Sequence, residues 1–521
     1  MASTNSTDFV RLSQSLHDLG LDPSARLVPA VLRYCTKATE LAAVLSALQP
    51  ESAGARLRIA ICYDGVSKLC SGGGTSATMP SPMRTVDDLV AAALGEAFPG
   101  ALLHHIVLDV SHGYPVPREL ATHDAVARLV SALAFPDISG EEGLPDVFLA
   151  CGSGSLVDVV KHAVWTLEQR GWQRPALWVV PTALTVTAFT SRYAVLGHDG
   201  HKSTVPSALA DAVVFCEPIV TGAPADLRAA GVGDLIAGHV SYADWYVASR
   251  LGLADDYRPE PAALMMPLHR FLLTDQMGDG SASTQTLTQT HTHLLAETLA
   301  AAGVAMNLGG SSAPQSGGEH AVSHVIDELR HISGRPRHLH GLQVALAALA
   351  TASMHDWLDN VDFIPAGRVV AMNEDEMAAA VDRLFWLAPF SGSPAEFADP
   401  GGRLGWIDAH RAELEASCAR FVESAVAKAA VWRDLKGRIS HLQKEWPEIQ
   451  RVRHTLCATS LNLAASMERW HLPLSTEELD PPAHVTELRW ALRASVFFRA
   501  RFGIQDLVFF LGEDPVFAAA L

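Results

Sequence analysis

The stretch VFLACGSGSLVDVVKHA, residues 147–163, constrains the fold more than any other part of the chain. Its first five residues are apolar and partly β-branched, which is typical of a buried strand. Gly152, Ser153, Gly154 and Ser155 follow directly, and apolar residues then recur at helical spacing. Since the first turn of a helix has unpaired backbone N–H groups and a positive dipole end, the sequence predicts an anion-binding turn at the end of a strand.

The glycines of this turn predict what it binds. Gly152 and Gly154 have no Cβ, so a phosphate is expected to approach their backbone closely. A tight turn without a ligand is the alternative, because a bare GxGxxG pattern is a weak signal and Val157 stands at its third glycine position.

Length, charge and cysteine usage narrow the function classes. The 521 residues are enough for two or three domains. A formal net charge of −18 argues against a nucleic-acid partner and against an anionic membrane, but a small anionic substrate needs only a few local cations. The seven cysteines form no CxxC pair, Met1–Phe9 lacks a signal pattern, and no apolar run reaches the ~18 residues of a membrane span. We therefore expect a cytoplasmic protein without a membrane span.

The first part of the chain alternates short apolar runs with helical stretches. Residues 8–50 have helical periodicity, with Leu41, Val44, Leu45 and Leu48 on one face. Strands are expected at 56–64, 102–110, 147–151, 176–180 and 212–215, and helices at 86–98, 123–135 and 154–163. A long loop is expected at 70–82. This alternation indicates a parallel sheet flanked by helices, in which a ligand binds beyond the carboxyl ends of the strands.

After about residue 218 the pattern becomes helical. Helices are expected at 226–251, 262–273, 287–302, 320–330, 342–358, 374–387, 410–446, 484–503 and 504–511, with loops at 278–286 and 309–318. The sequence therefore predicts an α/β domain over residues 1–218 and an α-helical domain over residues 219–521.

Two polar residues follow expected strands. A carboxylate at Asp64 can accept hydrogen bonds from an adenosine ribose. Its alternative is a solvated acid or a helix N-cap, which position alone favours. Thr182 follows the next strand, and its hydroxyl can reach a pyrophosphate or ribose; a simple turn residue is the alternative.

One carboxylate and three histidines are candidate metal ligands. Asp234 lies in GVGDLIAGH, His340 lies in HLHGLQV, and both stand where helices are expected to begin. His320 and His324 are four residues apart in EHAVSH and share a helix face, so spacing alone favours them as a chelating pair. Such a set suits zinc or iron. The alternative for Asp234 is a helix N-cap. Because the chain has 23 histidines, the alternative for each histidine is an ordinary surface or core position.

Five motifs in the same order resemble the iron-containing alcohol dehydrogenase superfamily, and most of all the sn-glycerol-1-phosphate dehydrogenases with their bacterial branch. The motifs are GSGSLVDVVK, PTALTVTAFTS, AGVGDLIAG with YADW, GGEHAVSH and LHG, and the tail RWALRASVFFRARFGIQDLVFFLGE is also similar. The resemblance covers most of the chain. It implies a Rossmann-like nucleotide-binding domain over residues 1–218 and a metal- and substrate-binding helical domain over residues 219–521, the dehydroquinate synthase-like fold.

The resemblance also implies roles for individual residues. One divalent metal, zinc, iron or nickel, would be bound by Asp234, His320 and His340, and His324 would support these ligands or face the substrate. NAD or NADP would contact a set of residues around the turn, which are Asp64, Gly152, Ser153, Gly154, Ser155, Asp158 and Thr182. Asp64 would favour NAD by repelling a 2′-phosphate.

The catalytic residues implied by the resemblance are His324, Lys161, Lys202 and Thr187. Lys161 would lie near the nicotinamide, and Lys202 could meet a substrate anion. Thr187 stands where glycerol-type members carry an acid near the substrate hydroxyls, so that role is not transferred. A water, His324 or Thr187 could relay a proton.

The implied function is a metal-dependent NAD(P)(H) oxidoreductase that interconverts a small polyol, phosphorylated or not, and its ketone, of the glycerol-1-phosphate/dihydroxyacetone phosphate type. A homodimer or larger homo-oligomer is expected. The alternatives are a dehydroquinate synthase-like cyclase that uses NAD and a metal, a catalytically silent nucleotide-binding homologue, and the same reaction on another small aldehyde or ketone.

Overall fold

The computed structural model describes most of the chain. The described residues are 9–21, 27–48, 50, 56–64, 66, 68–70, 85–108, 121–132, 144–198, 200–273, 289–361, 372–388 and 400–521, without the side chains of 289, 400–403 and 434–442. The loops expected at 70–82 and 278–286 lie outside the described residues, except for Cys70. Two compact units divide the chain. Unit 1 contains Met1–Val232, Ala263–Leu268 and Asp279–Ser312, and unit 2 contains Gly233–Ala262, His269–Gly278 and Ala313–Leu521.

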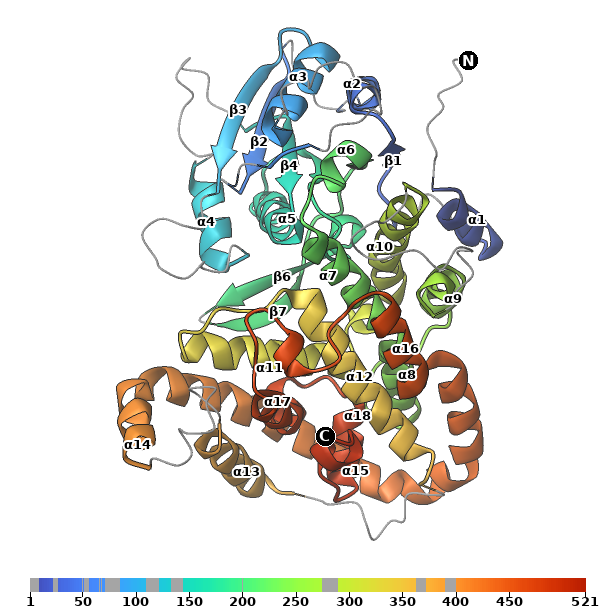
Figure 1. Ribbon diagram of the computed structural model, residues 1–521, viewed down its shortest axis with the longest axis vertical. Coiled ribbons are helices and arrows are strands. Elements are labelled where there is room, and N and C mark those ends of the chain that lie inside the picture. Colours follow the sequence, from blue (N-terminus) through green and yellow to red (C-terminus); the bar gives the residue numbers. More distant parts are fainter. Residues whose placement is uncertain are drawn as a thin grey trace. The chain divides into compact units, whose positions relative to one another are not determined.

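Unit 1 is built on a six-stranded sheet (Figure 1). Its strands are β1 Val31–Cys35, β2 Arg58–Tyr63, β3 Leu102–Val107, β4 Val147–Gly152, β5 Ala176–Pro181 and β8 Ala212–Cys216. They are ordered β1-β8-β5-β4-β2-β3, and every neighbouring pair is parallel. The prediction of a parallel sheet is confirmed.

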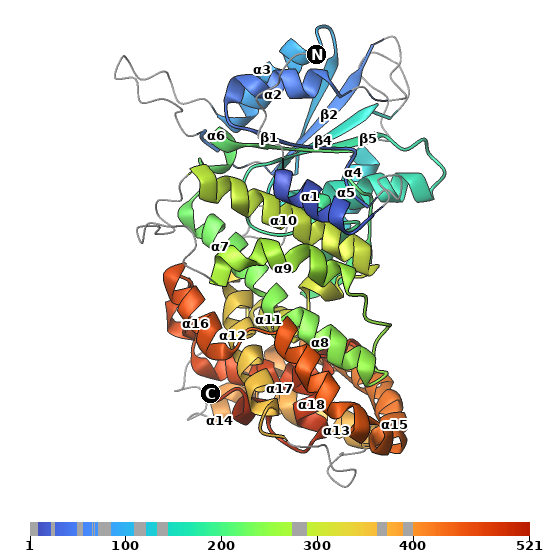
Figure 2. The ribbon, with the colours of Figure 1, turned by 90° about the vertical axis from the view of Figure 1, so that its right-hand side faces the viewer.

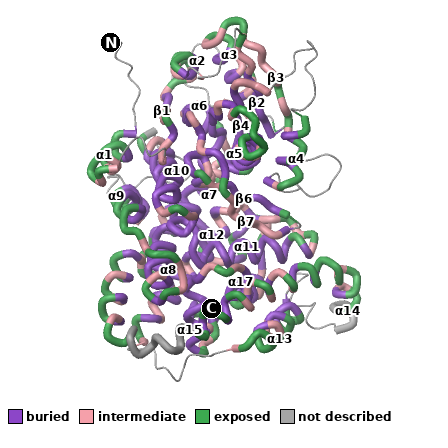
Figure 3. The backbone as a smooth tube through the Cα atoms, turned by 180° about the vertical axis from the view of Figure 1, so that it is seen from behind, coloured by how far each residue is buried: buried purple, intermediate pink, exposed green. Residues whose placement is uncertain are grey.

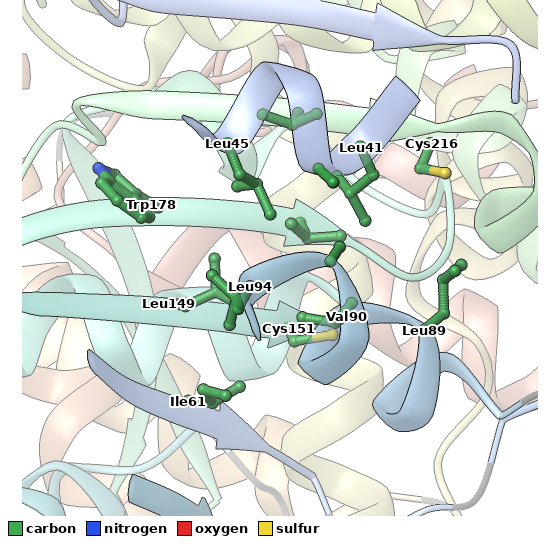
Figure 4. Close-up of a cluster of buried hydrophobic side chains, with 14 of the residues drawn as sticks. Leu41, Leu45, Ile61, Leu89, Val90, Leu94, Leu149, Cys151, Trp178 and Cys216 are labelled. Carbon is green, nitrogen blue, oxygen red and sulfur yellow. The ribbon is translucent and has the colours of Figure 1, made fainter. Parts of the chain in front are cut away.

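Helices cover both faces of this sheet. Helices α2 (Ala38–Ser46) and α3 (Val86–Ala97) lie on one face, and α4 (His123–Ala132) and α5 (Gly154–Gln169) lie on the other (Figure 2). A buried apolar cluster joins α2 and α3 to the strands beneath them (Figure 4). Because side chains alternate along a strand, β4 contributes every second residue, Val147, Leu149 and Cys151, to this cluster. Its other residues point to the opposite face of the sheet and are buried as well, which explains why nearly the whole strand is apolar.

Two elements of unit 1 differ from the sequence expectation. The helical periodicity expected over residues 8–50 is confirmed by α1 (Val10–Asp18) and α2, but these residues also contain β1, which was not expected. Strand β1 is short and only partly buried, and its pairing with the distant β8 forms the edge of the sheet. The antiparallel hairpin β6 (Tyr193–His198) and β7 (His201–Pro206) was also not expected. Both elements depend on pairing partners rather than on local periodicity.

Unit 2 is helical, as predicted, and its described residues contain no strand. Its helices are α8 Gly238–Arg250, α11 Gly318–Ile332, α12 His340–Leu358, α13 Glu374–Trp386, α14 Pro400–Ala409, α15 Arg411–Leu456, α16 Ser460–Arg469, α17 Val485–Phe498, α18 Ile504–Phe510 and α19 Pro515–Ala518. Helices α11 and α12 are buried along nearly their whole length (Figure 3). Among the described helices, none combines the length and the apolar character that a membrane crossing requires.

Three more helices lie in the part of the sequence where segments of the two units alternate. Helices α7 (Ala225–Ile236) and α9 (Glu260–Leu273) contain residues of both units, and α10 (Gln289–Gly309) belongs to unit 1. Helix α10 is held there by polar contacts: Thr190 Oγ1 donates to Ala300 O at 2.6 Å, and Asn307 Nδ2 donates to Thr190 O at 2.9 Å. These contacts attach a helix of the second half of the chain to unit 1.

Candidate cofactor and metal sites

The glycine turn lies at the carboxyl end of β4, where the strand order reverses. From β2 the chain continues to β3 on one side, and from β4 it continues to β5 on the other. In open parallel sheets such a reversal marks the ligand crevice. Cys62 of β2 pairs with Ala150 of β4. Asp64 and Gly152, each two residues further along, therefore end neighbouring strands at this reversal.

Polar groups without partners gather at this turn. The side chain of Ser153, directly before α5, makes no capping hydrogen bond, so the first N–H groups of α5 lack a side-chain cap. Thr182 donates its backbone N–H to Gly152 O at 3.0 Å, but its buried Oγ1 has no hydrogen-bond partner among the described residues. Uncapped N–H groups and an unpaired hydroxyl fit the phosphate and ribose oxygens of a dinucleotide.

Close packing is a second reason why both positions of the turn are glycine, and their expected contact with a phosphate stays a prediction. A Cβ on Gly152 would lie 2.2 Å from Leu156 Cδ2, and a Cβ on Gly154 would lie 2.1 Å from Val186 Cγ2. Leucine and valine side chains therefore occupy the space next to these glycines. The glycines allow the turn to pack closely against its own helix and against the segment after β5.

Asp158 and Lys161, both on α5, connect this helix to β6 and to the segment before it. Lys161 is fully buried, and its Nζ donates to the backbone oxygens of Ala188 at 2.8 Å and Tyr193 at 2.5 Å. Asp158 Oδ2 accepts the N–H of Val195 at 3.1 Å. Burial raises the pKa of Asp158 to about 6, against the opposing charge of Lys161. This geometry favours a positioning role for both side chains.

The other catalytic candidates of unit 1 lie beyond α5. Thr187 is buried and precedes the short 3-10 helix Ala188–Thr190. Lys202 lies in β7, is partly exposed, and lowers the pKa of Asp158 through its charge. Their proposed contacts with substrate stay predictions.

Asp234, His320 and His340 come together in unit 2, although they are far apart in the sequence. They belong to α7, α11 and α12. The Nε2 atoms of His320 and His340 lie 3.5 Å and 3.8 Å from Asp234 Oδ1, and one ligand atom from each residue lies within 4.8 Å of the others. A carboxylate oxygen and two imidazole nitrogens fit a divalent metal such as zinc or iron.

The ring of His320 is held in place by Glu319, a residue to which the sequence analysis gave no role. Glu319 Oε1 lies 2.8 Å from His320 Nδ1 and accepts the N–H of Gly317 at 2.7 Å. Burial lowers the pKa of His320, but hydrogen bonds to Asp234 and Glu319 outweigh this effect and raise it to about 8. A carboxylate on Nδ1 fixes the tautomer and directs the lone pair of Nε2 to a metal. The position of Glu319 directly before a ligand was the available signal.

Close helix packing brings the other two ligands together. A Cβ on Gly233 would lie 2.2 Å from Gly341 O, so glycine is required where α7 meets α12. These glycines are the immediate neighbours of Asp234 and His340. The start of α11 is anchored by Asp244, which accepts the N–H of Gly318 at 2.7 Å.

His324 lies beside this group without being part of it. Its buried ring is centred 5.6 Å from the ring of His340 and 6.1 Å from that of His320. The group of potential ligands comprises Asp234, His320 and His340 only, within the described part of the chain. The chelating pair favoured by spacing alone is therefore not the arrangement that the geometry favours.

A cavity of about 530 Å³ lies in unit 1 at the amino ends of the strands, the end of the sheet opposite the glycine turn. It is lined by the first residues of β1, β5 and β8 and by Arg174 and Asp211. Arg174 pairs with Asp211 at 2.9 Å and donates to Leu209 O at 2.7 Å. Because this cavity lies at the amino ends of the strands, it is separate from the turn after β4.

Comparisons with known proteins confirm the resemblance over part of the chain. No family model matches it. It is similar to glycerol-1-phosphate dehydrogenases whose names specify NAD(P)+: 29% identical over 214 residues to that of Methanothrix thermoacetophila, 33% over 213 to that of Methanococcoides burtonii and 29% over 262 to that of Bacillus subtilis. These alignments cover 41%, 40% and 49% of this chain. They cover 56%, 55% and 63% of the relatives, so the chain spans little more than half of their length.

Two solved structures, a dehydrogenase and a synthase, illustrate how the chain compares in structure with known proteins. One is a probable glycerol dehydrogenase from Sinorhizobium meliloti, with 16% identity and a TM-score of 0.42 over 82% of this chain and 98% of that one. Another is a 2-deoxy-scyllo-inosose synthase, with 14% identity and a TM-score of 0.41 over 64% of this chain and 77% of that one.

Proposed function

We propose that this chain is a metal-dependent NAD(P)(H) oxidoreductase that interconverts a small polyol and its ketone, with glycerol 1-phosphate and dihydroxyacetone phosphate as the leading pair. The observation that carries the proposal is the group formed by Asp234, His320 and His340. The motif resemblance had assigned these residues to one metal, and their ligand atoms converge within 4.8 Å. The similarity to glycerol-1-phosphate dehydrogenases supports the choice of substrate.

The chain's own residues bind and orient the reactants. Asp234, His320 and His340 would hold one divalent cation, zinc, iron or nickel. When bound, such a cation supplies Lewis-acid chemistry and the nicotinamide supplies hydride transfer. The uncapped start of α5 and Thr182 Oγ1 would bind the dinucleotide, and Glu319 holds the His320 tautomer whose Nε2 faces Asp234.

Three further residues are proposed to act on the substrate. Lys202, which is partly exposed, would bind an anionic group. His324, next to His340, would hold or move the proton of the reacting hydroxyl. Thr187 would donate or accept one hydrogen bond without carrying a charge, so the substrate must tolerate a neutral partner there.

The experiment that tests this function combines metal analysis with an NAD(P)H absorbance assay on dihydroxyacetone phosphate and a panel of aldehydes. We expect one divalent metal per chain and oxidation of NADH or NADPH by dihydroxyacetone phosphate. His320→Ala should lose both the metal and turnover, while His331→Ala, at an exposed histidine of the same helix, should keep them. Full activity in metal-free His320→Ala protein would contradict the proposal.

The same assay separates the alternatives. A cyclase that reduces and reoxidises NAD within one turnover produces no net NADH. A catalytically silent homologue binds NADH without metal or turnover. If the protein reduced another aldehyde but not dihydroxyacetone phosphate, the proposed type of reaction would stand and the proposed substrate would be wrong.

A cytoplasmic location, a homodimer or larger assembly, and the absence of a nucleic-acid partner belong to this proposal. The formal net charge of −18 supports the last of these, because an acidic chain repels a polyanion. Sedimentation of the purified protein, with and without nucleic acid, measures both the oligomeric state and the binding.

A further inference from the structure

We infer that Lys68 allows this chain to accept NADP as well as NAD, because it pairs with Asp64 and can itself bind the 2′-phosphate. The inference rests on the proposed function, since it concerns the adenosine half of the proposed cofactor site. It replaces the sequence-based expectation that Asp64 selects NAD. No role was assigned to Lys68 from the sequence.

The position of Asp64 is the first step. Asp64 follows β2, and the pairing of Cys62 with Ala150 brings it level with Gly152 at the reversal of strand order. Neighbouring strands are ~4.8 Å apart, so this acid borders the glycine turn. An acid at the end of the strand beside a phosphate-binding turn is placed to accept hydrogen bonds from the ribose hydroxyls.

The ion pair at this acid is the second step. Lys68 Nζ lies 2.5 Å from Asp64 Oδ1, which also accepts the N–H of Val66 at 3.2 Å. The side chain of Asp64 is 10% exposed and that of Lys68 is 23% exposed. A lone carboxylate there would repel a 2′-phosphate, but this one is already paired with a cation. Lysine has three donors on a flexible stem, so its ammonium can contact a phosphate while it stays near the carboxylate.

The surrounding charges show why the lysine matters. Asp87, in the first turn of α3, is near enough to both residues that Lys68 lowers its pKa and Asp64 raises it, after the larger effect of burial. His105 of β3 also lowers the pKa of Asp87. Asp88, the next residue of α3, raises the pKa of Asp87 as well. Among the described residues, this edge therefore has three acids, one lysine and one histidine. Without Lys68, a 2′-phosphate would meet these carboxylates without the ammonium group that now offsets them.

The test measures the binding of NAD+ and NADP+ by calorimetry to the full-length protein and its variants. We expect Lys68→Met to weaken NADP+ binding about tenfold, the effect of losing one charge-assisted hydrogen bond, and to change NAD+ binding less than about twofold. Asp64→Asn should shift the preference toward NADP+. Lys444→Met, the same change at an exposed lysine, is the control and should change neither affinity.

A second probe locates the effect on the nucleotide. Adenosine 2′,5′-bisphosphate should lose about tenfold affinity in Lys68→Met, and adenosine 5′-phosphate should not. If both dinucleotides bind the wild type and Lys68→Met leaves their ratio unchanged, this inference is wrong while the proposed function stands. If neither dinucleotide binds the wild type, the proposed function and this inference fail together.

Discussion

The proposed cofactor turn and the proposed metal group are built in opposite ways. The turn comes from one contiguous stretch, β4 and α5, whose order along the chain already places the glycines at a strand end. The metal group takes one residue from each of three helices, α7, α11 and α12. A contiguous motif depends on local conformation, whereas a dispersed group depends on how helices pack. Changes in helix packing should therefore damage the metal group and spare the turn.

The surroundings of the two sites differ in the same way. The sheet that carries the turn has an apolar core, with one buried cluster of side chains from α2, α3 and the strands (Figure 4). Apart from groups such as Asp158 and Lys161 on α5, the titratable groups with strongly shifted pKa values that bear on this comparison lie buried in unit 2, among them His239, Asp244 and His269. Buried titratable groups make a structure sensitive to pH, because their charged forms lose solvation. Three predictions follow from this contrast, in order of expected effect.

Acid should destabilise unit 2 through His239 and His269. Both rings are buried, with centroids 5.0 Å apart; His239 Nε2 and both nitrogens of His269 have no hydrogen-bond partner among the described residues. Burial lowers the pKa of His239 to about 4 and that of His269 well below its usual value. The unfolded state therefore binds more protons between about pH 4 and 6.5. The histidine-linked stability is complete above about pH 6.5 and falls as the pH drops through this window, by about 2 kcal/mol at pH 5 for His239.

Denaturant unfolding at pH 7 and pH 5 measures this effect. His269→Leu should reduce the histidine-linked loss of unfolding free energy between the two pH values, because one of the two groups no longer titrates. His17→Leu, at a histidine whose side chain is 85% exposed, should leave the difference unchanged. An unchanged pH difference in His269→Leu would show that these rings do not carry the sensitivity of unit 2.

Glu319→Gln should weaken metal binding about 10- to 100-fold, because an amide can no longer fix the His320 tautomer as a carboxylate does. Competition with a chromogenic chelator measures the metal affinity, and NADH fluorescence measures the affinity of the proposed cofactor turn for NADH. Glu413→Gln, at an exposed acid of α15, is the matched control. If Glu319→Gln also lost NADH binding, the two sites would not be independent, and the contrast between them would be wrong.

Thr182→Val should weaken NADH binding by about two- to tenfold, the value of one neutral hydrogen bond, and leave the metal content unchanged. The substitution keeps the shape of the side chain and removes only the hydroxyl, which has no hydrogen-bond partner in the described part of the protein. Thr455→Val, at an exposed threonine, serves as the control. Unchanged NADH affinity together with higher stability would mean that the hydroxyl is an unsatisfied core group and no part of a cofactor site.

Several elements of the fold could be predicted because their signals are local. Strand β4, the glycine turn and α5 were expected from a continuous apolar run followed by helical spacing, and the helical character of unit 2 from long periodic stretches. Strand β1 and the β6–β7 hairpin were missed. Their residues are mostly of intermediate burial, so their sequences lack a clear apolar period. Pairing with β8 and within the hairpin, respectively, makes them strands.

Among the candidate site residues, the sequence by itself determined which side chains could bind a dinucleotide or a metal. It also determined where the turn stands, because a strand followed at once by a helix leaves the turn at the strand end. Tertiary structure alone decided that the ligand atoms of His320 and His340 converge on Asp234, that Glu319 supports His320, and that Lys68 pairs with Asp64. Helical spacing places residues on a face, but only packing against other helices and strands decides what that face meets.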